Sequence, residues 1–238
     1  MKIAICLLTC DRYAYTKRTI DSLLLRNQFQ LSYFDFYYGD DASENPKVRQ
    51  LADDAGFKCM FVNKKREGCS QSTAKLLNAV AATGKYGYII YVQNDFECIR
   101  PIPVHAIHRS FLLNHNVGAI RLYGDYKTVK PYQADPIGTR WLGVPDKPEF
   151  KWKRLRGNIY GEELESARCH VGLPPFVIRG ELIPKVFKQP KRTKDINMEW
   201  AKTNKSVGRF IDNVFNHIGF NKTPKGKWGR PKYDYNKD

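Results

Sequence analysis

Short apolar runs alternate with amphipathic segments through the first hundred residues of the chain. Four of these runs are typical of buried strands and lie at 2–9, 34–41, 58–63 and 88–92. Between them, apolar residues recur every three to four positions at about 15–27 and 70–82, which predicts two helices. Asn45 followed by Pro46 predicts the start of a third helix. Strands separated by single helices form parallel sheets with helices on both faces, so the pattern predicts an α/β fold.

Beyond residue 103 the alternation becomes less regular. The run at 117–124 predicts one strand, and 170–180 predicts one or two short strands around a Pro-Pro loop. Two more helices are expected, from about 197–199 to 205 and from 207 to about 216. We expect one domain with two halves, 1–103 and 104–220, followed by a basic, mobile tail at 221–238.

The composition is that of a globular protein and excludes a disordered chain. Apolar residues make up 42% and charged residues 27% of the 238 positions. No stretch approaches the 18 or so apolar residues of a membrane span, so no integral membrane segment is expected. The six cysteines include no C-x-x-C pair and no His at zinc-finger spacing. We therefore expect a reduced, cytoplasmic protein without structural zinc.

The net charge of +16 is concentrated in the second half of the chain. Residues 1–119 carry 15 basic and 11 acidic side chains, whereas residues 120–238 carry 25 and 13. Basic side chains neutralise phosphates and aromatic rings stack on bases, so mixed clusters of the two predict nucleic-acid binding. The candidate residues are Lys151, Trp152, Lys153, Arg154, Arg156, Lys227, Trp228 and Arg230. An anionic membrane surface, or the phosphates of a bound nucleotide, would attract the same charge.

Polar side chains stand where each of the first four predicted strands ends. They are Thr9, Asp11 and Arg12, then Asp40, Asp41 and Ser43, then Asn63, and finally Asn94, Asp95 and Glu97. Open parallel sheets bind ligands beyond these carboxyl ends, so the sequence predicts a site there. Asp95 and Glu97 are two residues apart, which predicts a shared Mg²⁺ or Mn²⁺ site, with Asn94 orienting a ligand beside it. The carboxylates of Asp40 and Asp41 suit the hydroxyls of a nucleoside.

The stretches AICLLTCDR, YYGDDAS, REGCSQSTAKLLNAV and YIIYVQNDFE resemble the nucleotide-sugar glycosyltransferases of the GT-A fold, especially the inverting family-2 type. The resemblance covers residues 3–103, and DFE stands where these enzymes have an Asp-x-Asp-like metal motif. It implies a Rossmann-like, mostly parallel sheet with an appended acceptor-binding region, a UDP-sugar donor, and Mn²⁺ or Mg²⁺. The implied donor-binding residues are Thr9, Arg12, Asp40, Gly68, Gln71 and Lys75. A helix N-terminus beside a lysine is also a natural anion site.

The resemblance further implies that the second half supplies a base and completes the metal site. Asp195 and Glu199 are four residues apart and share one helix face if the helix runs through both. Such a carboxylate deprotonates an acceptor hydroxyl when burial or a neighbouring charge raises its pKa. We favour Glu199 as the base. His217 is the implied last metal ligand; without the resemblance it is a surface or capping histidine.

These observations together predict a metal-dependent, inverting hexosyl- or pentosyltransferase. The charge of the second half favours DNA as the acceptor, with the hydroxyl of a 5-hydroxymethylpyrimidine such as 5-hydroxymethylcytosine as nucleophile. The base-glycosylating enzymes of bacterial viruses (bacteriophages) act in this way, in the cytoplasm of the host. Two alternatives stay open: a glycan or lipid acceptor at an anionic membrane surface, and a non-catalytic nucleic-acid-binding protein that retains the fold.

Overall fold

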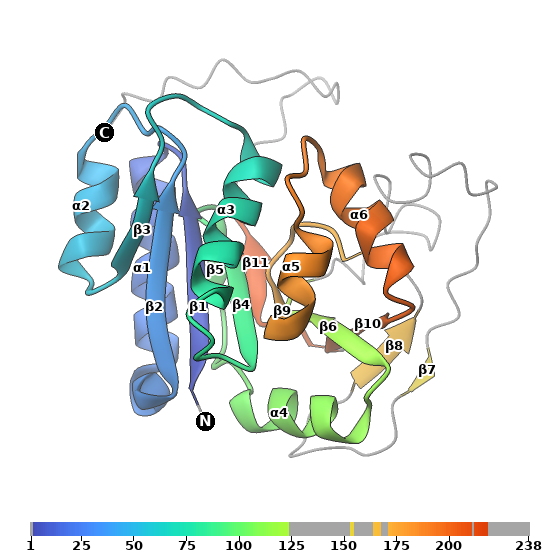
Figure 1. Ribbon diagram of the computed structural model, residues 1–238. Coiled ribbons are helices and arrows are strands. Elements are labelled where there is room, and N and C mark those ends of the chain that lie inside the picture. Colours follow the sequence, from blue (N-terminus) through green and yellow to red (C-terminus); the bar gives the residue numbers. More distant parts are fainter. Residues whose placement is uncertain (1, 124–152, 155–163, 168–170, 211, 219–238) are drawn as a thin grey trace, which may run out of the picture.

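The computed structural model describes residues 2–123, 153–154, 164–167, 171–210 and 212–218 of the chain (Figure 1). Its centre is a nine-stranded sheet of order β3-β2-β1-β4-β9-β6-β10-β8-β7. The strands of this sheet are β1 (Ile3–Thr9), β2 (Phe34–Asp40), β3 (Lys58–Val62), β4 (Tyr88–Gln93), β6 (Val117–Arg121), β7 (Lys153–Arg154), β8 (Leu164–Ala167), β9 (Phe176–Arg179) and β10 (Ser206–Phe210). Two further strands, β5 (Phe96–Cys98) and β11 (Phe215–His217), form an antiparallel pair beside it.

The described helices are α1 (Tyr13–Arg26), α2 (Lys47–Asp54), α3 (Cys69–Ala81), α4 (Val104–Leu113), α5 (Ile183–Val186) and α6 (Thr193–Lys202), with 3₁₀ turns at Gln28–Tyr33 and Gly180–Leu182. Among these described helices, none is long and apolar enough to cross a membrane.

The first four strands of the sheet run parallel, as the sequence predicts. β1 pairs in parallel with β2 on one side and with β4 on the other, and β3 continues the parallel series beyond β2. The strands β6 and β10 are also parallel to each other, but β9 lies between β4 and β6 and is antiparallel to both. The mostly parallel α/β sheet is therefore confirmed. The sheet takes strands from both sides of residue 103, and the division into halves stays a prediction.

Helices cover both faces of the sheet because its central strands are apolar on both sides. In β1 every residue is buried; Ile5 and Leu7 pack with α1 and α4, while Cys6 and Leu8 pack with α3, α5 and α6. In Figure 1, α3 lies in front of the sheet and α1 behind it. Each buried Leu or Ile side chain contributes roughly 1.5–3 kcal/mol of transfer free energy. This double layer fixes the carboxyl ends of β1, β2 and β4 at one edge.

The structure corrects several local predictions in the second half. The helix expected from 207 to 216 is wrong: Ser206–Phe210 is the strand β10, and Phe215–His217 is the strand β11. The apolar residues of this segment are buried between sheet neighbours, so tertiary pairing decided its conformation. The preceding helix begins earlier than expected, at Thr193, and ends at Lys202. Asn204 follows in a left-handed conformation, with φ 55°, which is incompatible with continuing that helix.

Candidate functional site

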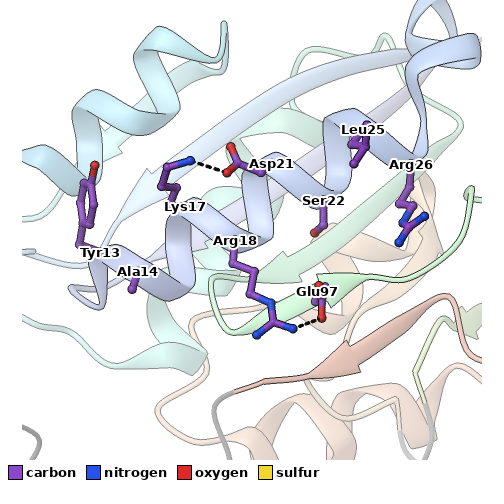
Figure 2. A pocket seen from close by; sticks show the side chains of 9 residues that line it. All are labelled: Tyr13, Ala14, Lys17, Arg18, Asp21, Ser22, Leu25, Arg26 and Glu97. Atoms are coloured by element: carbon purple, nitrogen blue, oxygen red, sulfur yellow. Dashed lines mark hydrogen bonds and ion pairs between the residues drawn. The ribbon is translucent and has the colours of Figure 1, made fainter. Parts of the chain in front are cut away.

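A cleft of about 370 Å³ opens at the carboxyl ends of β1, β2 and β4. Its lining includes Asp11, Arg12, Asp41, Arg66, Gly68 and Asp95. A second hollow, of about 450 Å³, follows the outer side of α1 and has Glu97 at its edge (Figure 2). We place the candidate site in the first cleft, because parallel sheets bind ligands beyond their carboxyl ends.

The turn between β1 and α1 is strained, and hydrogen bonds from residues that follow the neighbouring strands hold it in place. Asp11 and Arg12 have φ values of 49° and 59°, in the left-handed region that side chains other than glycine rarely adopt. The buried Asn94 donates from Nδ2 to the carbonyl oxygen of Asp11 (2.9 Å) and to Thr16 Oγ1 (2.8 Å). The backbone N–H of Asp11 donates to Ser43 Oγ at 2.8 Å. Such strain persists only where the surroundings over-determine it, and it is common at functional sites.

The carboxylate of Asp95 is contacted both by Arg12 of the β1–α1 turn and by His217 of β11. Its Oδ2 accepts a hydrogen bond from Arg12 Nη1 at 2.7 Å and lies 3.3 Å from His217 Nε2. Its other oxygen, Oδ1, is buried and has no hydrogen-bond partner. Burial by itself raises the pKa of Asp95, but the hydrogen bond and charge of His217, together with Arg12, outweigh burial and leave the pKa lowered. Asp95 is therefore held as a carboxylate.

His217 reaches Asp95 through the small β5–β11 pair. In that pair His217 stands opposite Phe96, and the N–H of Ile218 donates to the carbonyl oxygen of Asp95 at 2.9 Å. The two side chains meet across 122 positions of sequence. The structure thus brings together two of the three predicted metal ligands.

Glu97 points elsewhere. Its carboxylate pairs with Arg18 Nη2 of α1 at 2.6 Å, on the hollow that Figure 2 shows. Within the described residues, no three His, Cys, Asp or Glu side chains are grouped closely enough to hold a metal together. The expectation that Asp95 and Glu97 face one small volume is therefore wrong for this conformation, because Asp95 lies in the turn before β5 and pairs with Arg12, whereas Glu97 lies within β5 and pairs with Arg18.

A divalent cation still fits Asp95. The buried Oδ1 without a partner is an acceptor that such an ion would satisfy, and His217 places an imidazole nitrogen beside the same carboxylate. Mg²⁺ sites commonly use one or two carboxylates and take their remaining ligands from substrate phosphates and water. Asp95, with His217 beside it, therefore fits as the protein side of a metal that binds together with a diphosphate.

Thr9 and Asp40 are fully buried and bind each other. Thr9 Oγ1 donates to Asp40 Oδ2 at 2.8 Å, and Ser43 donates to the same carboxylate from its N–H (2.8 Å) and its hydroxyl (2.5 Å). Both side chains are 0% exposed, so neither reaches the cleft surface in this conformation. Their role as donor-binding residues stays a prediction; here they fix the tip of β2.

Asp41, the next residue, lines the cleft and fixes the start of α3. Its Oδ1 accepts from the N–H of Glu67 and from Asn63 Nδ2, both at 2.9 Å, and its Oδ2 accepts from the N–H of Gly68 at 3.0 Å. Burial alone raises the pKa of Asp41, but these hydrogen bonds outweigh it and lower the pKa. Gly68, with φ 92°, occupies a backbone conformation that favours glycine at the N-terminus of α3.

The start of α3, Arg12 and Arg66 are the groups of the cleft suited to an anion, beside the carboxylates of three aspartates. Gly68, the N-cap residue of α3, has no side chain to cap the helix, and Asp41 accepts the N–H of Gly68 itself, so the N–H groups of the first helical turn retain the partial positive charge of a helix N-terminus. Arg66 forms an ion pair with Asp11 across the cleft. Gln71 lies in the first turn of α3, whereas Lys75 donates to Asn63 Oδ1 at 2.6 Å one turn further along.

From the sequence, Asp11 is named among the polar side chains at the strand ends but is assigned no role, and Arg66 is not selected. Asp11 follows β1 at a strand end, which is a signal that the sequence contains. Arg66 carries no such signal, because it lies in a turn whose direction depends on the bonds from Asp41 to residues 67 and 68. These two residues are among those that line the cleft.

The predicted bases lie on α6. Asp195 Oδ2 accepts from the N–H groups of Lys191 and Arg192, both at 2.9 Å, and so caps the helix. Glu199 pairs through Oε1 with Lys202 at 2.6 Å. Thr193 Oγ1 lies 3.2 Å from Ser70 Oγ of α3, so the start of α6 adjoins the start of α3. Neither catalytic role is tested by this arrangement.

Most of the predicted nucleic-acid-binding residues lie outside the described part of the chain. These are Lys151, Trp152, Arg156, Lys227, Trp228 and Arg230. Lys153 and Arg154 form β7, whose backbone pairs with β8 at the edge of the sheet. Their binding role stays a prediction, as does the tail at 221–238, which also lies outside the described residues.

Comparison with known proteins shows the fold. No family model and no curated protein matches the chain. Among solved structures, TarS residues 1–349 of S. aureus in complex with UDP aligns with a TM-score of 0.54 at 12% identity, over 90% of this chain and 59% of that one. Glucosyl-3-phosphoglycerate synthase of Mycobacterium tuberculosis, in complex with Mg²⁺ and UDP, aligns with a TM-score of 0.54 at 12% identity, over 91% and 71%.

A CMP:2-keto-3-deoxy-manno-octonic acid synthetase in complex with CTP also aligns, with a TM-score of 0.51 at 13% identity, over 90% of this chain and 91% of that one. The chain spans about three fifths of the TarS structure. These alignments show that the chain has the fold of GT-A-type glycosyltransferases, a fold that the CMP:2-keto-3-deoxy-manno-octonic acid synthetase shares. Identities this low establish the fold alone.

Proposed function

We propose that this protein is an inverting glycosyltransferase that moves a sugar from a UDP-sugar to an acceptor hydroxyl. The observation that carries the proposal is the cleft at the carboxyl ends of β1, β2 and β4. It combines an uncapped helix N-terminus, two arginines and the carboxylate of Asp95. UDP in two of the similar structures supports a uridine donor.

The donor's diphosphate binds between α3 and the β1–α1 turn. The first N–H groups of α3 donate to phosphate oxygens, and the guanidinium groups of Arg12 and Arg66 neutralise their charge. Asp41 keeps α3 in place through its bonds to residues 67 and 68. This arrangement stabilises the negative charge that develops on the diphosphate when the bond from the anomeric carbon to its oxygen breaks.

Asp95 and His217 would hold the Mn²⁺ or Mg²⁺, which when bound supplies Lewis-acid stabilisation of the leaving diphosphate. Asn94 fixes the turn from which Arg12 projects. Glu97 pairs with Arg18 and is not needed for this arrangement.

A carboxylate of α6 accepts the proton of the acceptor hydroxyl as its oxygen attacks the anomeric carbon. We favour Glu199, because Asp195 already accepts two backbone N–H groups as a helix cap. Glu199→Gln keeps the shape and removes the proton acceptor, so it should lower the rate by roughly 10²- to 10⁴-fold and leave UDP binding unchanged. If Asp195→Asn shows that pattern and Glu199→Gln does not, the base is one helical turn earlier. If neither variant loses activity, the base does not lie on α6.

For the acceptor we favour DNA that carries a 5-hydroxymethylpyrimidine. The support is the net +12 of residues 120–238, in clusters of Lys and Arg interleaved with Trp, Phe and Tyr. A base inside a duplex is inaccessible, so the enzyme would flip it out of the stack. A glycan or lipid at an anionic membrane is the competing acceptor, since charge alone attracts both.

The decisive test of the reaction is product analysis with a panel of UDP-sugars, with Mn²⁺ or with excess chelator. Sugar transfer releases UDP, whereas a synthetase reaction with CTP and a free sugar acid releases pyrophosphate. Asp95→Ala should abolish UDP release, and Asp54→Ala, an exposed aspartate of α2, is the matched control. Full activity in chelator would refute the metal requirement. Pyrophosphate release from CTP and a free sugar acid would show that the reaction is nucleotidyl transfer and not sugar transfer.

The acceptor is tested with the same enzyme on DNA with and without 5-hydroxymethylcytosine. We expect a mass increase of one sugar only on the modified DNA. DNA affinity should fall with salt, with a log–log slope of about −0.9 per phosphate contact. Neutralising Lys151, Lys153, Arg154 and Arg156 together should flatten that slope while UDP-sugar hydrolysis persists. Absence of sugar in digests of the modified DNA refutes the DNA acceptor, whatever the affinity.

A further inference from the structure

Arg12 and a divalent cation would bind the same carboxylate, that of Asp95. Arg12 Nη1 lies 2.7 Å from Asp95 Oδ2, which is a full charge-assisted hydrogen bond. Of the two carboxylate oxygens, Oδ1 is buried without a partner, while Oδ2 is shared by Arg12 and His217. An ion on either oxygen of Asp95 would therefore lie at short range from the Arg12 guanidinium.

The two partners differ in how freely they move. Asp95 is fixed, since its backbone carbonyl oxygen accepts from the N–H of Ile218 and the preceding residue, Asn94, is buried and hydrogen-bonded. The Arg12 side chain is 28% exposed, against 12% for the Asp95 side chain. Its guanidinium group is carried by a flexible chain of methylene groups, and the residue lines the cleft. Two positive groups repel each other at short range, so an ion at Asp95 disfavours Arg12 there and favours its rotation toward an anion in the cleft.

We propose that Arg12 is a place-holding cation: it neutralises Asp95 in the free enzyme, gives way to the divalent cation, and then binds the donor's diphosphate. The inference rests on the proposed function. Arg12 stands at the N-cap of α1 with φ 59° and ψ 59°, and from this position its guanidinium reaches Asp95. The exchange makes metal and donor binding mutually dependent. Metal binding frees Arg12 for the diphosphate, and diphosphate binding frees Asp95 for the metal.

The consequence is a competition that is measurable without turnover. Replacing Arg12 by Met removes the competing charge, so Mn²⁺ should bind the UDP-free variant about tenfold more tightly than the wild type. In the wild type, UDP should tighten Mn²⁺ binding by about 5- to 150-fold, the usual range of coupling between two sites. In Arg12→Met this factor should be several-fold smaller, because the variant has no arginine to transfer.

The experiment is electron paramagnetic resonance of free Mn²⁺ titrated into full-length protein, with and without UDP. Arg18→Met is the matched control: it removes the same charge from α1, but Arg18 pairs with Glu97 outside the cleft, so Mn²⁺ affinity should be unchanged. Arg12→Lys, which retains the charge, should fall between the wild type and Arg12→Met. Circular dichroism confirms that each variant is folded.

The outcomes separate this inference from the proposed function. If the wild type binds Mn²⁺ and Arg12→Met binds it no more tightly, the place-holding role is refuted while the metal site stands. If Arg12→Met and Arg18→Met tighten binding equally, the effect is general surface charge, and the inference is again refuted. A wild type that binds UDP by calorimetry but no Mn²⁺ with UDP present refutes the metal site and this inference together, and leaves donor binding intact.

Discussion

Replacing Asp41 by Asn tests the reasoning about the cleft most directly. Asp41 is 3% exposed and accepts three N–H groups: from Asn63, and from the backbone at residues 67 and 68. Asn has nearly the same shape, but one of its two acceptor oxygens becomes an NH₂ group. Whichever way the amide turns, at least one donor then faces another donor.

The expected cost follows from these three bonds. A hydrogen bond to a charged group contributes about 1.5–3 kcal/mol, and a neutral one about 0.5–1.5 kcal/mol. Asp41→Asn loses at least one hydrogen bond outright and weakens the others. We therefore expect it to lower the free energy of unfolding by about 3 kcal/mol at pH 7. That is a large part of the roughly 5–15 kcal/mol by which domains are stable.

The effect of this substitution should depend on pH. The pKa of Asp41 is lowered in the folded protein, so its stabilisation is fully present above the unfolded-state pKa of about 3.9. It is lost as the pH falls through the lower folded-state pKa. Asn does not titrate, and the other carboxylates titrate in both proteins. The stability difference between wild type and Asp41→Asn should therefore shrink below about pH 4.

Urea denaturation followed by far-ultraviolet circular dichroism at pH 7 and near pH 3 measures both quantities. Asp54→Asn is the control, since Asp54 is exposed on α2 and should change stability by less than about 0.5 kcal/mol. A difference below about 0.5 kcal/mol for Asp41→Asn at pH 7 would contradict the hydrogen-bond argument. A difference that stays constant down to pH 3 would contradict the assigned pKa direction.

Three further predictions concern the core, a close backbone approach and the cleft. Leu7→Ala removes a fully buried side chain and should cost about 2–5 kcal/mol in urea denaturation; a loss under 1 kcal/mol would contradict its core position. Gly180→Ala places a Cβ 2.5 Å from the carbonyl oxygen of Tyr86 and should cost about 1–3 kcal/mol, whereas Gly87→Ala meets open space and should be nearly neutral. Arg66→Met should weaken UDP binding by calorimetry and reduce its salt dependence, and equal affinity at all salt concentrations would remove Arg66 from the diphosphate site.

The sequence alone determined the layered fold and the edge at which the site lies. Strands buried on both faces, such as β1 and β4, are continuous apolar runs, and helices α1 and α3 show their own period, because both signals are local. Polar residues at the ends of these strands placed the site at the carboxyl edge. Asp95 and Asp41 were found in this way.

Only the tertiary structure decided which of the neighbouring carboxylates reach the cleft. Asp41 lines the cleft, whereas Asp40 is fully buried and hydrogen-bonded. Asp95 forms an ion pair with Arg12, whereas Glu97 forms one with Arg18. Spacing in sequence cannot separate such pairs, because the face that a side chain takes depends on strand register and turn geometry.

The second half depended still more on distant contacts. The segment 206–217 has the composition of a helix as readily as of strands, and its pairing with β6, β8 and β5 decided the outcome. That pairing also carries His217 to Asp95 across 122 residues. Local preference is worth a few tenths of a kcal/mol per residue, whereas burial in a sheet is worth several times more for each large apolar side chain, so the long-range contacts win.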